Sequence, residues 1–214
     1  MKTVNIMVKG WVKVLPFYLF ALLPLLCSCS EAEEEDEEYA DWQNRNETYF
    51  EGQYQAHSAQ SATQFVLPSW AQASSKSVSE VAHTSCVLVD VLKEGVGPES
   101  LSSPYYTDTV LVNYGGRLMP TVRYPSGYLF DSSYLTTYDP DVDVPYQTAV
   151  NLNSMVEGFS TALQHMHRGD QWRVTIPYQL GYGTTAGTSI PAYSTLVFEI
   201  ELVDFWSKEE GDRD

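Results

Sequence analysis

Apolar and polar residues alternate along much of the second half of the chain. In residues 195–206, TLVFEIELVDFW, the apolar Leu196, Phe198, Ile200 and Leu202 occupy every second position. A period of two is typical of a strand that buries one of its faces. Three other stretches, rich in β-branched residues and bounded by Gly, Pro or Ser, also predict strands: TSCVLVDVL (84–92), DTVLVNYGGRL (108–118) and QWRVTIPY (171–178).

One stretch between these strands has helical spacing instead. Its apolar residues fall on one helical face: Met155, Val156, Phe159, Ala162, Leu163 and Met166. Asn153 and Ser154 precede this face and are suited to cap the helix. Strands, a single helix and further strands predict an α+β domain over residues 84–206, in which a bent antiparallel β-sheet wraps one short α-helix.

A second helix is expected nearer the N-terminus. Residues 39–56 place Trp42, Tyr49, Phe50 and Tyr54 at roughly helical spacing, which predicts an amphipathic helix. Its aromatic face can pack on the chain's own domain; the alternatives are self-association of two chains and binding of a partner. The residues that follow, up to position 82, are rich in Ser, Ala and Gln and are interpreted mainly as a linker.

The N-terminal end has the features of a secretory signal. Residues 1–13 contain three lysines and no acid, and an apolar run that is short for a membrane span follows them. The run ends in LCSC (26–29), which resembles a bacterial lipobox because Leu26 lies three residues before Cys29 and a small residue lies just before it. We therefore expect Cys29 to carry a lipid that anchors the chain to a membrane. The alternative is an ordinary signal peptide with two incidental cysteines.

A run of acids follows this cysteine. Residues 30–38, SEAEEEDEE, are too charged to be buried. Their position resembles the export signal of Bacteroidota surface lipoproteins, and it also fits a solvated spacer. The expected location is the outer membrane, on the cell surface or the periplasmic face. The predicted organisation is a signal peptide (1–28), an acidic tether (29–38), a helical arm and linker (39–83), the α+β domain (84–206) and a charged tail (207–214).

Charge and cysteine content argue against a nucleic-acid-binding protein and against a disulfide-bonded one. The net charge of −16 argues against a nucleic-acid partner, because such binding needs Lys and Arg to displace counterions from phosphates. Once the signal is removed and Cys29 is lipidated, Cys86 is the remaining cysteine, so no intrachain disulfide can form. Cys86 lies in an apolar run and is interpreted as a small buried residue.

Common catalytic and metal-binding sets are weak in this sequence. It has no P-loop and no GxSxG motif. His165 and His167 lack cysteines or acids at zinc spacing. Asp139, Asp141 and Asp143 lack the glycine and distal glutamate of a calcium loop, which favours a solvated loop. We therefore expect no metal and no cofactor.

One carboxylate stands out in the stretch GYLFDSS (127–133). Asp131 follows Leu129 and Phe130 at the end of what reads as a buried strand. Burying a lone charge is costly unless hydrogen bonds satisfy it. Asp131 is therefore expected either to be well hydrogen-bonded or to have a function.

Taken in order, pieces of residues 84–206 resemble the FKBP-type peptidyl-prolyl isomerases. The pieces are DTVLVNYGGRL, YLFDSS, MVEGFSTALQHMHRGDQWRVTIP, LGYG, SIP and TLVFEIEL. Each is weak by itself, but their order and spacing are specific. The resemblance implies an FKBP-like fold, isomerisation of X–Pro bonds without a cofactor, and proline-containing polypeptide segments as partners.

The resemblance also implies a set of site residues. Those expected to take part in catalysis are Tyr114, Phe130, Asp131 and Tyr182, and those expected to bind substrate are Tyr146, Met155, Val156, Phe159, Ile190 and Phe198. In the family, aromatic residues grip the proline ring, while the N–H at Val156 and the hydroxyl of Tyr182 meet the substrate. Asp131, held by neighbours such as Tyr114, would tune the polarity around the twisting carbonyl. The alternative is that Asp131 only ties two strands together.

Departures from the family pattern leave two functions open. The loops at 118–127 and 134–145 are longer than usual, Phe159 stands where Trp is common, and Ser189 replaces an apolar residue beside Ile190. The first function is an isomerase that assists the folding of exported or envelope proteins, which the preserved pocket residues favour. The second is a non-catalytic binding module or a subunit that helps assemble an envelope complex, which the long loops and the aromatic arm favour.

Overall fold

The computed structural model describes residues 37–73, 77–95, 102–134 and 147–207. The chain divides into two units, residues 1–40 and 41–214. In the first unit, the described residues include a turn in which the Ala40 N–H donates to the Glu37 carbonyl at 3.3 Å. The second unit contains the sheet and its helices. Among the described residues, no helix is long and apolar enough to cross a bilayer.

Several expectations concern residues outside the described ranges. These are the signal peptide, Cys29 and most of the acidic tether, the loop that holds Asp139, Asp141 and Asp143, the substrate-binding candidate Tyr146, and most of the C-terminal tail.

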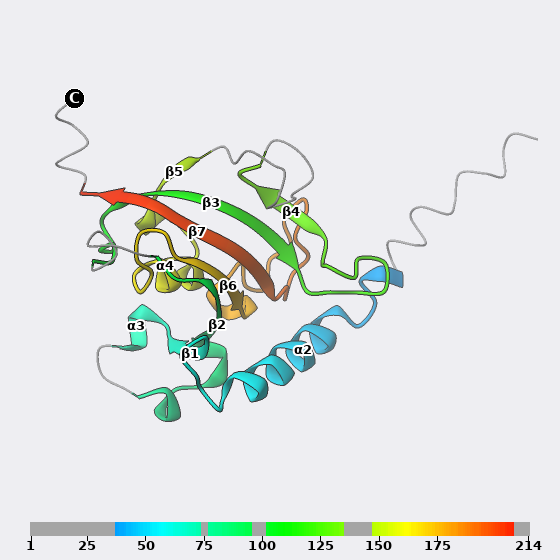
Figure 1. Cartoon of the computed structure of the whole chain (residues 1–214). Coiled ribbons are helices and arrows are strands. Elements are labelled where there is room, and N and C mark those ends of the chain that lie inside the picture. Colours follow the sequence, from blue (N-terminus) through cyan, green and yellow to red (C-terminus); the bar gives the residue numbers. More distant parts are fainter. Residues whose placement is uncertain (1–36, 74–76, 96–101, 135–146, 208–214) are drawn as a thin grey trace, which may run out of the picture. The chain divides into compact units, whose positions relative to one another are not determined.

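An antiparallel sheet organises the second unit (Figure 1). In the described part of the chain it has seven strands, in the order β1 (Gln64–Pro68), β2 (Cys86–Lys93), β6 (Gln171–Ile176), β7 (Leu196–Trp206), β3 (Thr109–Leu118) and β4 (Leu129–Ser132), with β5 (Thr148–Asn151) also paired to β3. The four strands expected from apolar patterning are present as β2, β3, β6 and β7. Figure 1 shows β3 and β7 as long, curved strands. The predicted bent antiparallel sheet is thus confirmed.

Helix α4 (Glu157–Leu163) packs on one face of the sheet, which we call the inner face. All its residues from Gly158 to Leu163 are buried. The helix backbone comes so close to β6 that a Cβ at Gly158 would lie 2.3 Å from Cγ2 of Ile176. A side chain at this position would therefore push the helix off the sheet.

The start of α4 differs from the sequence-based expectation. Asn153 and Ser154 lie in a preceding 3-10 turn, η4 (Leu152–Ser154), and Val156 occupies the position before the helix. The prediction that Asn153 and Ser154 cap the helix was therefore wrong. The Ser154 hydroxyl instead donates to the Asn151 carbonyl at 2.7 Å and closes the turn.

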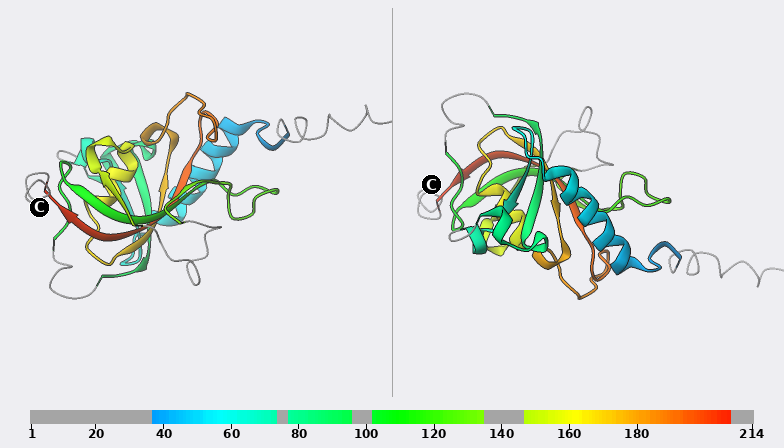
Figure 2. Two further views of the ribbon diagram at one scale, coloured as in Figure 1. Left: turned by 90° about the horizontal axis from the view of Figure 1, so that it is seen from above. Right: turned by 90° about the horizontal axis from the view of Figure 1, so that it is seen from below.

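Helix α2 (Trp42–His57) covers part of the opposite face, the outer face, and Figure 2 shows it crossing one side of the domain. Its buried Phe50 and Tyr54 join a second apolar core with Cys86 and Leu88 of β2. Neighbouring residues of a strand point to opposite faces. Leu88 and Val89 therefore point to opposite faces of the sheet. Because α2 packs on Leu88, it lies on the face opposite to Val89 and α4.

The expected amphipathic helix is present as α2, but the expected linker is only partly a linker. Within residues 57–82, strand β1 pairs with β2 along its whole length and buries Val66 in the second core. Such a strand is hard to detect because it is five residues long and only its central side chain is fully buried. The remaining connections contain short helical turns: α3 (Trp70–Ala73), η1 (Val78–Glu80), η2 (His83–Ser85) and η5 (Tyr178–Leu180).

The second core makes Cys86 inert, as its apolar surroundings in the sequence predicted. Its side chain is fully buried. Burial raises the pKa of the Cys86 thiol to about 11, so the group is protonated at neutral pH. A protonated thiol is a poor nucleophile.

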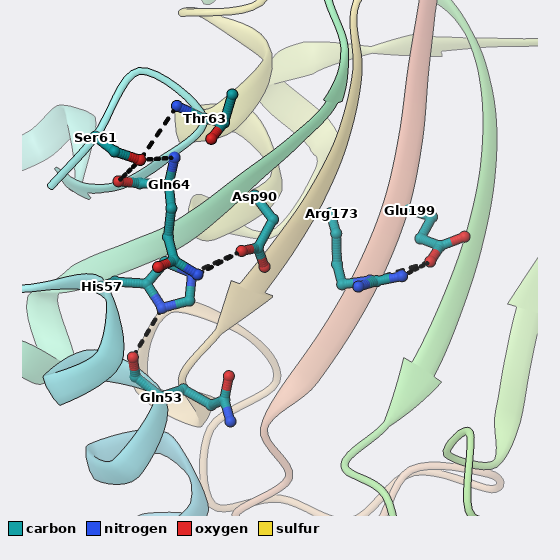
Figure 3. A network of polar contacts seen from close by, with 8 residues as sticks. All are labelled: Gln53, His57, Ser61, Thr63, Gln64, Asp90, Arg173 and Glu199. Carbon is teal, nitrogen blue, oxygen red and sulfur yellow. Dashed lines mark hydrogen bonds and ion pairs between the residues drawn. The ribbon is translucent and has the colours of Figure 1, made fainter.

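Polar contacts fasten the C-terminal end of α2 to the sheet (Figure 3). His57 is 1% exposed; its Nδ1 donates to the Gln53 carbonyl at 2.8 Å, and its Nε2 lies 3.3 Å from Oδ1 of Asp90 on β2. The Gln64 side-chain amide of β1 donates to the same Asp90 oxygen at 2.9 Å. Asp90 of β2 therefore connects the end of α2 and the start of β1 to the sheet.

Candidate functional site

Aromatic rings meet on the inner face of the sheet. Opposed residues of antiparallel strands point to the same face, and the register pairs Tyr114 with Ile200 and Gly116 with Phe198. Tyr114 and Phe198 therefore face α4, which contributes Phe159. The ring centroids of Phe159 and Phe198 lie 5.1 Å apart, and those of Tyr114 and Phe159 lie 6.0 Å apart, both edge to face. Phe159 and Phe198 are almost fully buried.

A β-bulge adds Phe130 to this group. Between β3 and β4, Gly116 pairs with Asp131 but Arg117 pairs with Leu129, so Phe130 is an extra residue on its strand. Such a residue re-aims the side chains around it. The bulge lets the consecutive Phe130 and Asp131 both serve the inner face, where strict alternation would place them on opposite faces. We call Tyr114, Phe130, Phe159 and Phe198 the aromatic floor.

Gly116 makes room for two rings of the aromatic floor. The centroids of Phe130 and Phe198 lie 5.5 Å apart in a T-shaped arrangement directly over this glycine. A Cβ at Gly116 would lie 2.6 Å from Cε1 of Phe198 and 2.7 Å from Cζ of Phe130. Gly116 was not identified from the sequence, although a Gly-Gly pair inside a strand is a signal of close approach.

Tyr114 and Asp131 form the polar edge of the floor. The Tyr114 hydroxyl donates to Oδ2 of Asp131 at 2.8 Å, and the Ser132 N–H donates to Oδ1 at 2.9 Å. Burial raises the pKa of Tyr114, and the hydrogen bond to the Asp131 carboxylate and its charge raise it further. The hydroxyl therefore stays protonated, as a donor, throughout the physiological pH range. Asp131 accepts two hydrogen bonds, one of them from Tyr114 as the resemblance implied, but it is exposed, so this end of the strand is not buried as its apolar neighbours had suggested. Strand β4 lies at the edge of the sheet order and leaves the carboxylate in solvent.

Ser133 holds Tyr114 in place and was not identified from the sequence. The Tyr114 N–H donates to the Ser133 hydroxyl at 2.8 Å, and the Ser133 N–H donates to the Tyr114 carbonyl at 2.9 Å. Ser133 is 7% exposed. The only sequence signal was the repeated serine after Asp131, which has many structural explanations.

A cavity of about 450 Å³ opens beside the aromatic floor, and we call it the site cavity. Phe130 and Asp131 line one side, and Tyr182, residues 185–189 and Ile190 line the other. Tyr182 is 51% exposed. Its pKa is raised by partial burial and by the negative charge of Asp131, so its hydroxyl is also a donor at neutral pH. Of the aromatic floor, Phe130 is the residue that lines this cavity, together with Ile190, the Tyr182 hydroxyl and the Asp131 carboxylate. Tyr114, Phe159 and Phe198 are not part of the lining.

Three further site candidates are not found in the described lining of this cavity. Met155 and Val156 do not belong to the described lining of the cavity. Both are half-buried and directly precede α4, which carries Phe159. The first N–H groups of a helix have no partner within the helix, so this position suits a contact with a bound chain. Tyr146 lies outside the described residues.

The chemistry available at the site is that of binding. In the described ranges, no three His, Cys, Asp or Glu side chains gather where they could hold a metal ion. Phe130 and Ile190 give the cavity an apolar wall against which a ring of modest size can pack, and the rim offers the Tyr182 hydroxyl as a donor and Asp131 as an acceptor. This arrangement suits a ligand that is apolar at one end and amide-like at the other.

A second cavity of about 500 Å³ lies on the outer face, between α2 and the loop after β3. Its floor is charged: Arg173 donates to Glu199 Oε1 through Nη2 at 2.7 Å and through Nε at 3.1 Å, as drawn in Figure 3. Asp90 stands opposite Arg173 in the strand register. Arg173 and Glu199 offset each other's charge, and the aromatic floor is on the other side of the sheet.

Known proteins resemble the part of the chain that builds this site. The sequence model of a family described as FKBP-type peptidyl-prolyl cis-trans isomerase matches residues 102–203. The chain is 37% identical over 115 residues to the FKBP-type 22 kDa peptidyl-prolyl cis-trans isomerase of Escherichia coli K12, which covers 53% of this chain and 47% of that protein. It is 35% identical over 119 residues to FK506-binding protein 2 of Kluyveromyces lactis, which covers 55% of this chain and 76% of that protein. The chain belongs to the FKBP-type peptidyl-prolyl cis-trans isomerase family.

The fold agrees with membership of the FKBP-type family. A crystal structure of a peptidyl-prolyl cis-trans isomerase from Pseudomonas syringae pv. tomato superposes with a TM-score of 0.50 at 26% identity, covering 78% of this chain and 95% of that one. The chain spans about half the length of several curated relatives that it matches. The matched residues 102–203 begin after β1 and β2, although both strands are paired into the same sheet.

Proposed function

We propose that the chain catalyses cis–trans isomerisation of X–Pro bonds in polypeptide segments of exported or envelope proteins. The observation that carries the proposal is the aromatic floor beside a cavity rimmed by Asp131 and Tyr182. Family membership supports it, because curated members are named for this activity.

The reaction needs no nucleophile, metal or redox group. Rotation about an X–Pro bond is slow because the amide resists twisting, with a barrier of about 18–20 kcal/mol. Resonance is lost as the amide twists, so its carbonyl becomes less polar than in the planar form. A dry aromatic pocket therefore stabilises the twisted form better than water does, and this difference lowers the barrier.

Each group of the site has a part in this proposal. The proline ring enters the site cavity and packs against Phe130 of the aromatic floor. The N–H of Val156 and the hydroxyl of Tyr182 donate hydrogen bonds to the flanking carbonyls of the bound segment. Asp131 keeps the Tyr114 hydroxyl pointed toward the rim through their 2.8 Å hydrogen bond. Its negative charge also disfavours a strongly polar carbonyl oxygen nearby, which acts against the planar amide.

The test is protease-free measurement of cis–trans exchange on a panel of X–Pro peptides, with the chain from residue 39 onward. Phe130→Ala removes one wall of the floor and is expected to lower kcat/KM about tenfold, the equivalent of roughly 1.4 kcal/mol. Asp131→Ala is expected to lower it several-fold. Asp131→Asn keeps the shape and an acceptor for Tyr114, so it isolates the effect of the charge.

Phe205→Ala is the matched control for these variants. Phe205 is a half-buried aromatic residue near the end of β7, where its ring packs under Arg168. This change should leave exchange rates unaltered. A folded wild-type chain that accelerates no peptide of the panel would remove the isomerase proposal and favour a non-catalytic binding module. Full activity in Asp131→Ala would give that carboxylate a structural role only.

We also propose that the chain is an outer-membrane lipoprotein anchored at Cys29, with the acidic residues 30–38 as a solvated tether. The support is the LCSC sequence at the end of an apolar run. Two-residue spacing between cysteines makes Cys27 a natural internal control. In a bacterium that processes lipoproteins, Cys29→Ala is expected to move the full chain from the detergent phase to the aqueous phase or leave it unprocessed, whereas Cys27→Ala should change neither. The reverse pattern would place the lipid at Cys27, and no effect of either change would remove the anchor.

A further inference from the structure

We propose that helix α2 is a brace for the site, and that Asn46 and Trp42 are positioning residues that fix the loop carrying Tyr182 and Ile190. We call residues 179–193 the pocket loop. The consequence for catalysis rests on the proposed isomerase function; the brace itself rests on contacts alone.

Few contacts fix the pocket loop from within; one is the hydrogen bond that the Gly187 N–H donates to the Ile190 carbonyl at 2.8 Å. Residues 184–189 are all exposed, and Tyr182 is half exposed. The loop is closed at its base, where the Tyr193 N–H donates to the Gly183 carbonyl at 3.0 Å and the Gly183 N–H donates to the Tyr178 carbonyl at 2.8 Å. Segments with few buried contacts open at low free energy, so the placement of Tyr182 depends on how its two stems are held.

Asn46 holds the C-terminal stem of the loop. Its side chain is fully buried, its Oδ1 accepts the Thr195 N–H at 2.7 Å, and its Nδ2 donates to the Trp42 carbonyl at 2.8 Å. The Thr195 hydroxyl donates to the Asn46 carbonyl at 3.4 Å. A buried amide with both ends satisfied is a rigid connection, and its loss would leave the Thr195 N–H unpaired.

Trp42 reaches the residue beside it. Its Nε1–H donates to the Ser194 hydroxyl at 2.9 Å, and that hydroxyl donates to the Pro191 carbonyl at 2.6 Å. Pro191 directly follows Ile190, which lines the site cavity. A chain of two hydrogen bonds therefore runs from α2 to the residue next to the cavity wall.

The same helix also holds the N-terminal stem. The Tyr178 hydroxyl donates to Oε1 of Glu47 at 3.2 Å, and the Tyr178 ring packs edge to face on Tyr193 at 5.2 Å. A cavity of about 320 Å³ lies beside these contacts, bordered by Asn46, Tyr178 and Thr195. Hydrogen bonds from α2 therefore restrain both stems of the pocket loop.

The test compares two changes in α2 that differ in where they act. Asn46→Ala removes the contact with the loop stem. Tyr54→Leu weakens the docking of the same helix at its other end, where Tyr54 packs in the second core and stacks on His83. Amide hydrogen exchange of residues 181–190 is measured in both variants. Urea denaturation midpoints are also recorded, so that loop exchange is compared at similar losses of stability. Trp42→Phe, which removes the Nε1–H bond to Ser194 and keeps an aromatic ring at this position, is the milder variant if Asn46→Ala does not fold.

The expected result is faster exchange of the loop amides in Asn46→Ala and Trp42→Phe, and wild-type exchange in Tyr54→Leu. With an active wild type, kcat/KM should fall about tenfold in Asn46→Ala, mainly through KM because Tyr182 and Ile190 contact the substrate. Equal loop exchange in all variants, or equal effects of Asn46→Ala and Tyr54→Leu, would overturn the brace. An inactive wild type would remove the proposed function but leave the exchange comparison decisive for the brace.

Discussion

Replacing Phe198 by alanine is expected to lower the free energy of unfolding by about 3–5 kcal/mol, the usual cost of emptying a buried phenylalanine site. Phe198 is 5% exposed, and its ring packs against the rings of Phe159, Phe130 and Tyr114 at 5.1, 5.5 and 6.3 Å. The cavity left behind would be bounded by three rings that cannot all collapse into it. Urea denaturation, read from the midpoint at constant slope, measures this change.

Phe198→Leu is the companion variant. Leucine refills most of the volume but loses the edge-to-face ring contacts, so its loss of stability should be less than half that of Phe198→Ala. Isomerase activity should fall in both, since the floor loses a ring in each. A midpoint for Phe198→Ala within error of wild type would mean that the aromatic floor does not contribute to the core as described.

Adding one methyl group at Gly116 is expected to remove most of the activity while leaving the chain folded. The new Cβ would lie 2.6–2.8 Å from ring atoms of Phe130 and Phe198, so one or both rings must move by several tenths of an ångström or more. Displacement of positioned groups on the scale of ~1 Å costs about a hundredfold in rate. We expect kcat/KM of Gly116→Ala to fall between about tenfold and a hundredfold in the same exchange assay.

Gly52→Ala is the matched control for this change, because it is the same substitution without neighbours. Apart from its chain neighbours and the backbone of its own helix, nothing lies within 4 Å of a Cβ at Gly52, which is exposed in the middle of α2. Alanine there should raise stability by roughly 0.5–1 kcal/mol through helix propensity and leave activity unchanged. Wild-type activity in Gly116→Ala would show that Phe130 moves without consequence, and would exclude its ring from the site.

Most of the sheet could be predicted because its strands each bury one face. The alternation in residues 195–206 reappears as buried Leu196, Phe198, Ile200 and Leu202 between half-buried neighbours. Strand β1 escaped prediction because it is short and buries only Val66 fully. The start of α4 was placed too early because Met155 and Val156 fit the apolar face, although their backbone is extended.

The candidate site, like the fold, could be predicted only in part. The resemblance to the FKBP-type family singled out Tyr114, Phe130, Phe159 and Phe198, which the fold brings together. The exposure of Asp131 could not be read from its apolar neighbours, since it follows from the position of β4 at the sheet's edge. Asn46 carried no signal, because its partner Thr195 lies 149 residues away and spacing along a helix says nothing about such contacts.

The bulge at Phe130 makes the length of β4 part of the definition of the site. Residues 129–131 form two pairs with β3 where three would be expected. Deleting one of them would change which side chains of β4 face the inner side of the sheet, with little change in the overall composition or hydropathy of the chain. When relatives are compared position by position, a gap placed inside this strand would therefore transfer the roles of Phe130 and Asp131 to the wrong residues.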